Sequence, residues 1–320
     1  MRAKALLRIV GARVGFPVPL AVGFEITHLC NLSCHYCDRH TPLPNEMSYE
    51  QIHQALFELK EAGMQELSLD GGEPLTHRHI AAVVEQLLEW RVVVRMNTNG
   101  ILVPKKLDVV RRLQKLKISL DGPAERHDRM RGKEAFRRAL AGAHAARDAG
   151  VPVEFTCVVG QHNHDALDEL MDLVEAQGYR IIFQPARSSL FLETDRDGSA
   201  FTLENQQIRD AFARVEARKR RSDVVLNAWS SLRHFRSFPN DVELPCAAGH
   251  INVTLDPEGN LFHCGQVSRL NRSNNVVKLG VAECLARLRR RGCSQCWCAR
   301  VVEENYAWGG HFGQMLPPRA

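Results

Sequence analysis

The sequence predicts an α/β fold, a partial (β/α)6 barrel followed by a small C-terminal unit that contains a β-hairpin, a helix and several cysteines. Between residues 22 and 185, short apolar runs alternate with longer amphipathic stretches, as in parallel strands joined by helical crossovers. Six such units fill this region, whereas a closed eight-unit barrel needs about 250 residues. Apart from Cys157, the cysteines form two groups, at 30–37 and 246–298.

The expected strands and helices follow one another in regular order. Strands are expected at 22–27, 65–69, 92–97, 116–120, 153–159 and 180–184, and helices near 48–62, 77–90, 104–114, 133–149 and 165–177. Ser48 and Gln51 form the S-x-x-Q pattern of a capping box. Gly63, Gly150 and Gly178 stand just past expected helix ends, where glycine is favoured. Right-handed crossovers between these strands give an incomplete, TIM-like barrel.

The same pattern divides the chain into five regions. An N-terminal extension, residues 1–21, precedes the barrel core at 22–185, and residues 186–245 form a connecting region with one basic helix near 203–221. Residues 246–300 form the cysteine-rich unit. Alternating apolar residues there flank Pro-Glu-Gly-Asn at 257–260, which predicts a hairpin, and a helix is expected near 281–291. Residues 301–320 are interpreted as a C-terminal tail.

Composition excludes several classes of protein. The 320 residues are 44% hydrophobic and 25% charged, with a net charge of +5, which is typical of a globular protein rather than a disordered one. No apolar run reaches the ~20 residues of a membrane helix, and Arg8 and Arg13 interrupt the apolar N-terminus, so no signal peptide is expected. No basic run with interleaved aromatics indicates nucleic-acid binding. We therefore expect a cytoplasmic protein with no membrane or nucleic-acid partner.

Cys30, Cys34 and Cys37 follow the first expected strand with the spacing C-x3-C-x2-C. Three thiolates on one such loop can hold three irons of a [4Fe–4S] cluster and leave the fourth iron open. A zinc knuckle is the alternative, but a structural zinc site takes four ligands and no fourth is evident here. The spacing therefore favours an iron–sulfur cluster.

This cysteine spacing and four later motifs together resemble the radical S-adenosylmethionine (SAM) superfamily. The motifs are LDGGEPL at 69–75, NTNG at 97–100, KISLDG at 117–122 and HDRMRG at 127–132. Asp70 departs from the family, which more often has Ser or Thr at this place. The resemblance implies that SAM binds the open iron and contacts residues at the strand ends. These residues are Tyr36, Gly71, Gly72, Glu73, Pro74, Asn99, Ser119 and Asp121.

The C-terminal cysteines resemble the auxiliary-cluster extension called SPASM, or its shorter twitch form. Cys246-x12-Gly259-x4-Cys264 matches its opening pattern. Two all-cysteine clusters need eight ligands, which this region does not supply. We therefore expect one auxiliary [4Fe–4S] cluster, so that the protein carries two clusters and SAM. The expected auxiliary ligands are Cys246, Cys264, Cys293 and Cys296, with Cys298 as an alternative to Cys296. A four-cysteine zinc ribbon is the competing interpretation.

The resemblance implies an enzyme that cleaves SAM to a 5′-deoxyadenosyl radical and abstracts hydrogen from an unactivated carbon. The expected substrate is a ribosomally made peptide or a small-molecule natural product, and the expected outcome is oxidation or cross-linking. The enzymatic alternatives are an aminocyclitol or aminoglycoside dehydrogenase and an epimerase, for which Cys157 and Cys298 are the candidate hydrogen donors. The expected partner is a reductant such as flavodoxin or ferredoxin. The non-enzymatic alternatives are an iron–sulfur electron carrier and a zinc-binding nucleic-acid protein.

Overall fold

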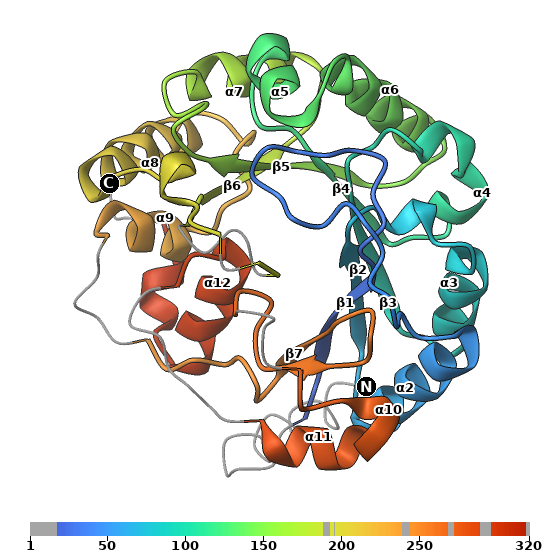
Figure 1. The fold of residues 1–320 in the computed structure, drawn as a ribbon. Helices are drawn as coiled ribbons and strands as arrows, with labels where there is room; N and C mark the ends of the chain where they lie inside the picture. The colour runs from blue at the N-terminus through green and yellow to red at the C-terminus, as the bar shows by residue number, and fades with distance from the viewer. Residues whose placement is uncertain are drawn as a thin grey trace.

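The computed structural model describes residues 18–187, 193–194, 196–238, 244–267, 272–288 and 296–317. In these segments the strands form one sheet in the order β6-β5-β4-β3-β2-β1-β7-β8. All neighbouring pairs are parallel except β7 and β8. The sheet curves around a central space, and helices cover its outer face (Figure 1). The predicted partial (β/α)6 barrel is confirmed.

The six core strands lie where the sequence predicted them, with ends that differ by at most two residues. They are β1 (Ala21–Thr27), β2 (Glu66–Gly71), β3 (Val93–Thr98), β4 (Lys115–Ser119), β5 (Val153–Val159) and β6 (Ile181–Pro185). Successive side chains on a strand point to opposite faces. In β4, Leu116 and Ile118 are buried, whereas Lys117 and Ser119 line the central space. The inner surface of the barrel is therefore polar along this strand.

The outer helices follow the predicted order, with two differences. They are α2 (Tyr49–Ala62), η1 (Pro74–Thr76), α3 (Ile80–Glu89), η2 (Val103–Lys105), α4 (Leu107–Val110), α5 (Ala124–Arg131), α6 (Ala135–Asp148) and α7 (Leu167–Ala176). The capping box at Ser48 forms as predicted. The helix expected at 104–114 is short, because a 3-10 turn that includes Pro104 precedes it. The helix expected at 133–149 is preceded by the separate α5, which ends at Gly132 with φ of 117°.

The C-terminal half closes part of the barrel. It contains η4 (Ser199–Phe201), α8 (Asn205–Lys219), α9 (Trp229–Arg236), β7 (Asn252–Leu255), β8 (Leu261–Phe262), α10 (Val276–Leu279), α11 (Val281–Arg287), α12 (Ala299–Trp308) and η5 (Phe312–Met315). The hairpin β7–β8 forms as expected, with Thr254 opposite Phe262. Its strand β7 pairs with β1, Val22 opposite Val253, so the cysteine-rich unit extends the barrel sheet.

Helix α12 occupies the side of the barrel between β6 and β7 (Figure 1). The sequence interpretation treated residues from 301 onward as a tail, but most of α12 lies there. The reason is burial, since Val302 and Tyr306 pack into the core. The N-terminus of α12 consequently faces the inside of the barrel.

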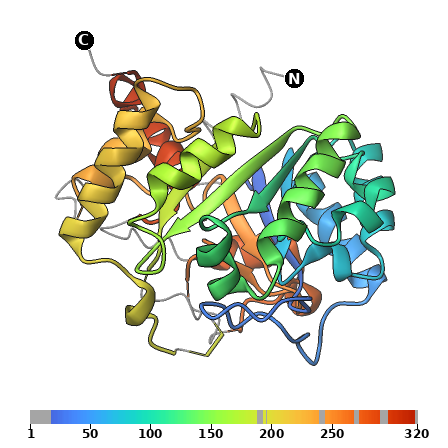
Figure 2. The same ribbon diagram turned by 90° about the horizontal axis from the view of Figure 1, so that it is seen from above.

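The loop after β1 crosses the end of the barrel at which the parallel strands terminate (Figure 1, Figure 2). The amide of His35 in this loop donates to the carbonyl of Met130 in α5 at 3.0 Å. The apolar core lies between the sheet and the helices and includes Phe24, Phe155 and Phe183. Among the described segments, no helix combines the length and the hydropathy needed to cross a bilayer.

Candidate active site

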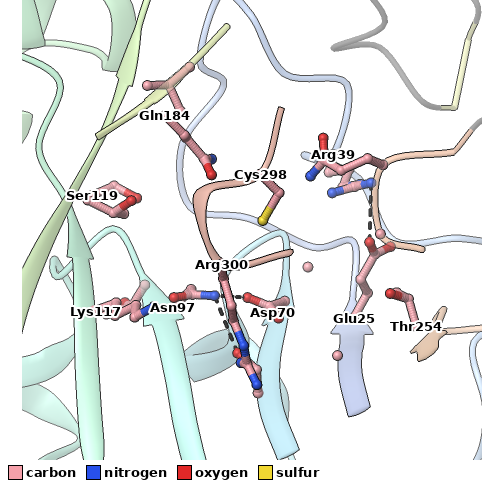
Figure 3. A pocket seen from close by; sticks show the side chains of 18 of the residues that line it. Glu25, Arg39, Asp70, Asn97, Lys117, Ser119, Gln184, Thr254, Cys298 and Arg300 are labelled. Carbon is pink, nitrogen blue, oxygen red and sulfur yellow. Dashed lines mark hydrogen bonds and ion pairs between the residues drawn. The ribbon is translucent and has the colours of Figure 1, made fainter. Parts of the chain in front are cut away.

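A cavity of about 460 Å³ occupies the inside of the barrel toward the carboxyl ends of the strands. Its wall comes from the inner faces of β1–β7, the loop after β1 and the N-terminus of α12 (Figure 3). The volume is in the range of small-molecule sites. In parallel α/β barrels, active sites lie at this end of the strands. The cavity is therefore the candidate active site.

Cys30, Cys34 and Cys37 all line this cavity. The turn between the last two is tight, since the Cys37 amide donates to the Cys34 carbonyl at 3.1 Å. Burial, together with the smaller effect of the Cys37 charge, raises the pKa of Cys30 to about 11 and that of Cys34 to about 12. These thiols are close enough to repel one another as thiolates, and none forms a disulfide. Three converging soft ligands of this kind fit three irons of a [4Fe–4S] cluster.

Gly71 and Gly72 form a cradle of backbone beside the cysteines. A Cβ atom on Gly72 would lie 2.5 Å from the carbonyl oxygens of both His28 and Leu29. Gly71 has φ of 120°, and a Cβ there would lie 2.3 Å from the Thr27 carbonyl. Only glycine allows so close an approach of two chain segments. The cradle presents backbone to the cavity, as binding of a small ligand such as SAM requires.

Glu73 positions the end of β3 against the cysteine loop. Its buried carboxylate accepts hydrogen bonds from the Thr98 hydroxyl and the Asn99 amide, both at 2.8 Å. The Asn99 side chain in turn donates to Asn31 at 2.8 Å and lies 3.9 Å from the Cys30 sulfur. Burial raises the pKa of Glu73 to about 6. Asn99 lines the cavity, whereas the side chains of Glu73 and Pro74 do not.

Asp121 lies behind the cavity wall and acts through its neighbours. Its carboxylate accepts from the Tyr36 hydroxyl and from Arg131 Nε, the latter at 2.6 Å. Tyr36 and Arg131 line the cavity, and Asp121 does not. Burial alone would raise the pKa of Asp121, but the Arg131 charge holds it well below its usual range. The Arg131 guanidinium also lies over the Tyr36 ring, 5.5 Å from its centroid. The sequence interpretation expected Asp121 to contact SAM, and this residue does not line the cavity.

The two candidate hydrogen donors lie in different places. Cys298 lines the cavity at the N-terminus of α12, and its sulfur points inward (Figure 3). Cys157 is fully buried and lies 3.5 Å from Asn163 Nδ2. Thr156 and Val158, its neighbours on β5, line the cavity, so Cys157 points to the opposite face of the strand. This placement argues against Cys157 as a donor to a substrate in the cavity.

Three of the expected auxiliary ligands, Cys246, Cys264 and Cys296, lie in the described segments. Cys264 lines the cavity. Cys296 lies two residues before Cys298, its sulfur 3.9 Å from the Cys298 carbonyl oxygen. The residue after Cys246, Ala247, donates its amide to Asn305 of α12 at 2.8 Å. Cys293 lies outside the described residues.

Sequence reasoning missed several charged residues of the cavity. Arg131 belongs to the HDRMRG motif, so the motif could have identified it as a residue of the site. Glu25 and Arg39, which pair at 3.2 Å, flank the cysteine loop. Arg300 enters the cavity from α12 and pairs with Glu66 at 2.7 Å. No local pattern in the sequence could place Arg300 there, because the contact depends on how α12 packs.

Comparison with known proteins agrees with this geometry. Residues 24–174 match the family model described as the radical SAM superfamily. The AdoMet-dependent heme synthase of Methanosarcina barkeri is 30% identical over 52% of this chain and 50% of its own length. The mycofactocin maturase MftC of Mycolicibacterium smegmatis is 27% identical over 78% of this chain and 65% of its own. The PqqA peptide cyclase of Rhizobium meliloti is 24% identical over 77% of this chain and 67% of its own.

Solved structures agree on the fold. The structure of Streptococcus suis SuiB bound to S-adenosylmethionine has a TM-score of 0.66 with this protein and 15% identity, over 88% of this chain and 67% of that one. The chain described here spans between half and two thirds of the length of the curated relatives given above.

Proposed function

Because residues 24–174 make this chain a member of the radical SAM superfamily, we propose that it is an enzyme that uses SAM and a [4Fe–4S] cluster to modify a peptide. The observation that carries the proposal is one cavity lined at once by Cys30, Cys34 and Cys37, by the glycine cradle and by Asn99. A plain electron carrier needs the cysteines but not the cradle.

Different residues of this cavity have different proposed roles. The three cysteines of the loop after β1 are suited to hold the cluster, and Gly71 and Gly72 let SAM approach the backbone. Glu73 and Asp121 hold the surrounding loops in place through the contacts described above. When bound, the cluster would supply the electron for reductive cleavage of SAM, which provides the means to abstract a hydrogen atom from the substrate.

The extent of the sequence similarity to relatives favours a peptide over a small molecule as the substrate. The heme synthase resembles only about half of this chain. The maturase and the peptide cyclase resemble more than three quarters of it, including part of the C-terminal half. We propose oxidation or cross-linking of a peptide as the outcome, with a flavodoxin or ferredoxin as reductant. Cys246, Cys264, Cys293 and Cys296 are the proposed ligands of an auxiliary cluster.

Epimerisation is the second candidate outcome, because one observation favours it. The Cys298 thiol faces the cavity (Figure 3), where it could return a hydrogen atom to a substrate radical if it does not bind iron. A reaction run in heavy water separates the two outcomes. One deuterium gained at carbon, and lost with Cys298→Ala, supports epimerisation, whereas a product lighter by two hydrogens supports oxidation.

The first test requires no substrate. Protein purified and reconstituted without oxygen is analysed for iron, and its formation of 5′-deoxyadenosine from SAM is measured after addition of dithionite. About eight irons per chain and formation of 5′-deoxyadenosine are expected. Zinc in place of iron, or an iron protein that leaves SAM intact, would contradict the proposal.

A further inference from the structure

Lys117 projects into the cavity from the middle of β4. Its strand neighbours Leu116 and Ile118 are buried, and in the β3–β4 ladder Lys117 lies level with Asn97. Figure 3 shows Lys117 beside Asn97, with Ser119 further along the same strand. Side chains two residues apart on one face of a strand are roughly 7 Å apart. Lys117 therefore lies one step deeper in the barrel than Ser119.

Among the described residues, most charged side chains of the cavity form ion pairs, whereas Asp70 and Lys117 do not. The charged residues that line it are Glu25, Arg39, Asp70, Lys117, Arg131, Arg300 and Glu304. Glu25 pairs with Arg39, and Arg300 pairs with Glu304 at 2.9 Å. Asp70 accepts a hydrogen bond from Asn97, and Arg131 pairs with Asp121 outside the wall. Within the part of the chain that the structure describes, the Lys117 ammonium has no hydrogen bond or ion pair.

The acidic side chains nearest to Lys117 interact with other residues. Glu154, opposite Lys117 in the β4–β5 ladder, pairs with Lys115. Asp70 is held by Asn97. Burial lowers the pKa of Lys117, and the charges of Glu154 and Asp70 offset only part of that effect. A partly desolvated cation without a partner is costly, and a bound anion relieves this cost.

We propose that Lys117 binds a carboxylate group of the peptide substrate and so selects a peptide that carries this group at the reacting position. The inference rests on the proposed function. A carboxylate is favoured over a phosphate because one ammonium balances one negative charge, and the cavity already holds Asp70 and Glu304. The carboxylate can belong to an acidic side chain or to the C-terminus of the peptide.

The position of Lys117 suits such an anchor. Ser119 lies one step toward the end of the barrel where the cysteines and the glycine cradle meet. A carboxylate bound at Lys117 therefore places the carbons next to it in the space between Lys117 and the SAM site. Lys117 binds substrate in this scheme and transfers no proton or electron.

Binding of small probes tests the proposal without any turnover. The protein is reconstituted without oxygen, saturated with SAM and labelled with lysine that carries ¹³C at Cε. Its spectrum is followed during titration with N-acetylglutamate N-methylamide, N-acetylglutamine and N-acetylglutamine N-methylamide. The first has only a side-chain carboxylate, the second only a terminal one, and the third has none. The Lys117 signal is assigned by its disappearance in Lys117→Met.

We expect one of the two acids to move the Lys117 signal and to bind at least about tenfold more tightly than the neutral amide, a difference of about 1.4 kcal/mol. Which acid does so identifies the source of the carboxylate. Lys117→Met should abolish the preference, and Lys117→Arg should keep it. Lys105→Met is the control, because Lys105 is exposed on η2 and does not line the cavity.

Three results would overturn the proposal. The first is equal binding of the two acids and the neutral amide by the native protein, which can be measured even if no variant folds. The second is a preference for an acid that persists in Lys117→Met. If SAM alone moves the Lys117 signal and neither acid does, Lys117 serves SAM rather than substrate. Because no reductant is present, these results are independent of the 5′-deoxyadenosine assay, which tests the proposed function separately.

Discussion

Arg131 Nε donates a 2.6 Å hydrogen bond to the carboxylate of Asp121, ten residues earlier in the chain. Asp121 follows β4 and is fully buried, whereas Arg131 ends α5 and lines the cavity. The same carboxylate accepts from Tyr36 in the cysteine loop. This pair therefore connects three segments around the candidate SAM site. The attraction between the two opposite charges stabilises the packing of these segments.

Arg131→Met should destabilise the protein by about 3–5 kcal/mol, because it leaves the buried Asp121 charge without a partner. Urea unfolding checks this. The matched control is Arg129→Met, in the same helix, whose pairing with Glu125 is exposed to solvent and should contribute less than about 1 kcal/mol. Equal losses in the two variants would show that the Asp121 pair does not stabilise these loops.

The buried His127 should make the fold sensitive to acid. Its Nδ1 accepts from the Asp121 amide at 3.1 Å, and burial, reinforced by the Arg131 charge, lowers its pKa to about 4. The unfolded chain takes up this proton near pH 6.5 and the folded chain only near pH 4. The stabilisation is therefore complete above pH 6.5 and is lost as the pH falls toward 4, by about 3 kcal/mol in total.

His127→Asn should remove this part of the pH dependence, because asparagine offers an oxygen acceptor that does not titrate. The free energy of unfolding of both proteins is measured between pH 7 and pH 4.5. If the two proteins lose stability in parallel over that range, groups other than His127 are responsible.

Gly72→Ala should weaken SAM binding and lower the free energy of unfolding by about 1–3 kcal/mol, since its Cβ would overlap two carbonyl oxygens. Equilibrium dialysis with SAM and urea unfolding measure the two effects. Gly313→Ala is the control, because its Cβ would have no neighbour within 4 Å. Normal SAM binding by Gly72→Ala would show that the cradle is not part of the SAM site.

Replacement of Cys30, Cys34 and Cys37 together by alanine should abolish formation of 5′-deoxyadenosine and leave roughly half of the iron. The remaining iron would belong to the auxiliary site, whose proposed ligands are all in the C-terminal region. Iron analysis and product chromatography check this. Loss of all iron would show that the two proposed sites are not independent.

Cys246→Ala or Cys264→Ala should lower the iron content from about eight to about four per chain while some cleavage of SAM persists. Cys284→Ala is the matched control, since Cys284 is buried in α11 and is expected to bind no metal. Unchanged iron in both ligand variants would refute the proposed auxiliary site.

Much of the fold could be read from the sequence because it is encoded locally. Each core strand is a short apolar run, and each helix following it has an apolar stripe. The cysteine loop, the glycine pair and the HDRMRG segment stand next to strands, and parallel strands bring their carboxyl ends to one edge. The meeting of Cys30, Gly72 and Asn99 in one cavity therefore followed from the order of the motifs.

The orientation of Cys157 could not be read in this way. Strands of a parallel barrel are buried on both faces, and in β5 Phe155 and Cys157 are buried while Thr156 and Val158 line the cavity. Alternation shows that neighbours point in opposite directions, but it does not show which set points inward. That choice depends on the packing of the surrounding helices.

The sequence by itself determined the repeating α/β architecture, the three thiols of the first cysteine loop and the glycines beside them, because each depends on neighbours close in the chain. The tertiary structure alone decided that α12 fills the side of the barrel and that Cys298 and Arg300 reach the cavity. It also decided that Lys117 lies there without a hydrogen bond or ion pair to any of the described residues. These features depend on contacts between residues as far apart as Glu66 and Arg300. Such contacts are fixed only when the whole chain packs, since no local pattern of residue types specifies them.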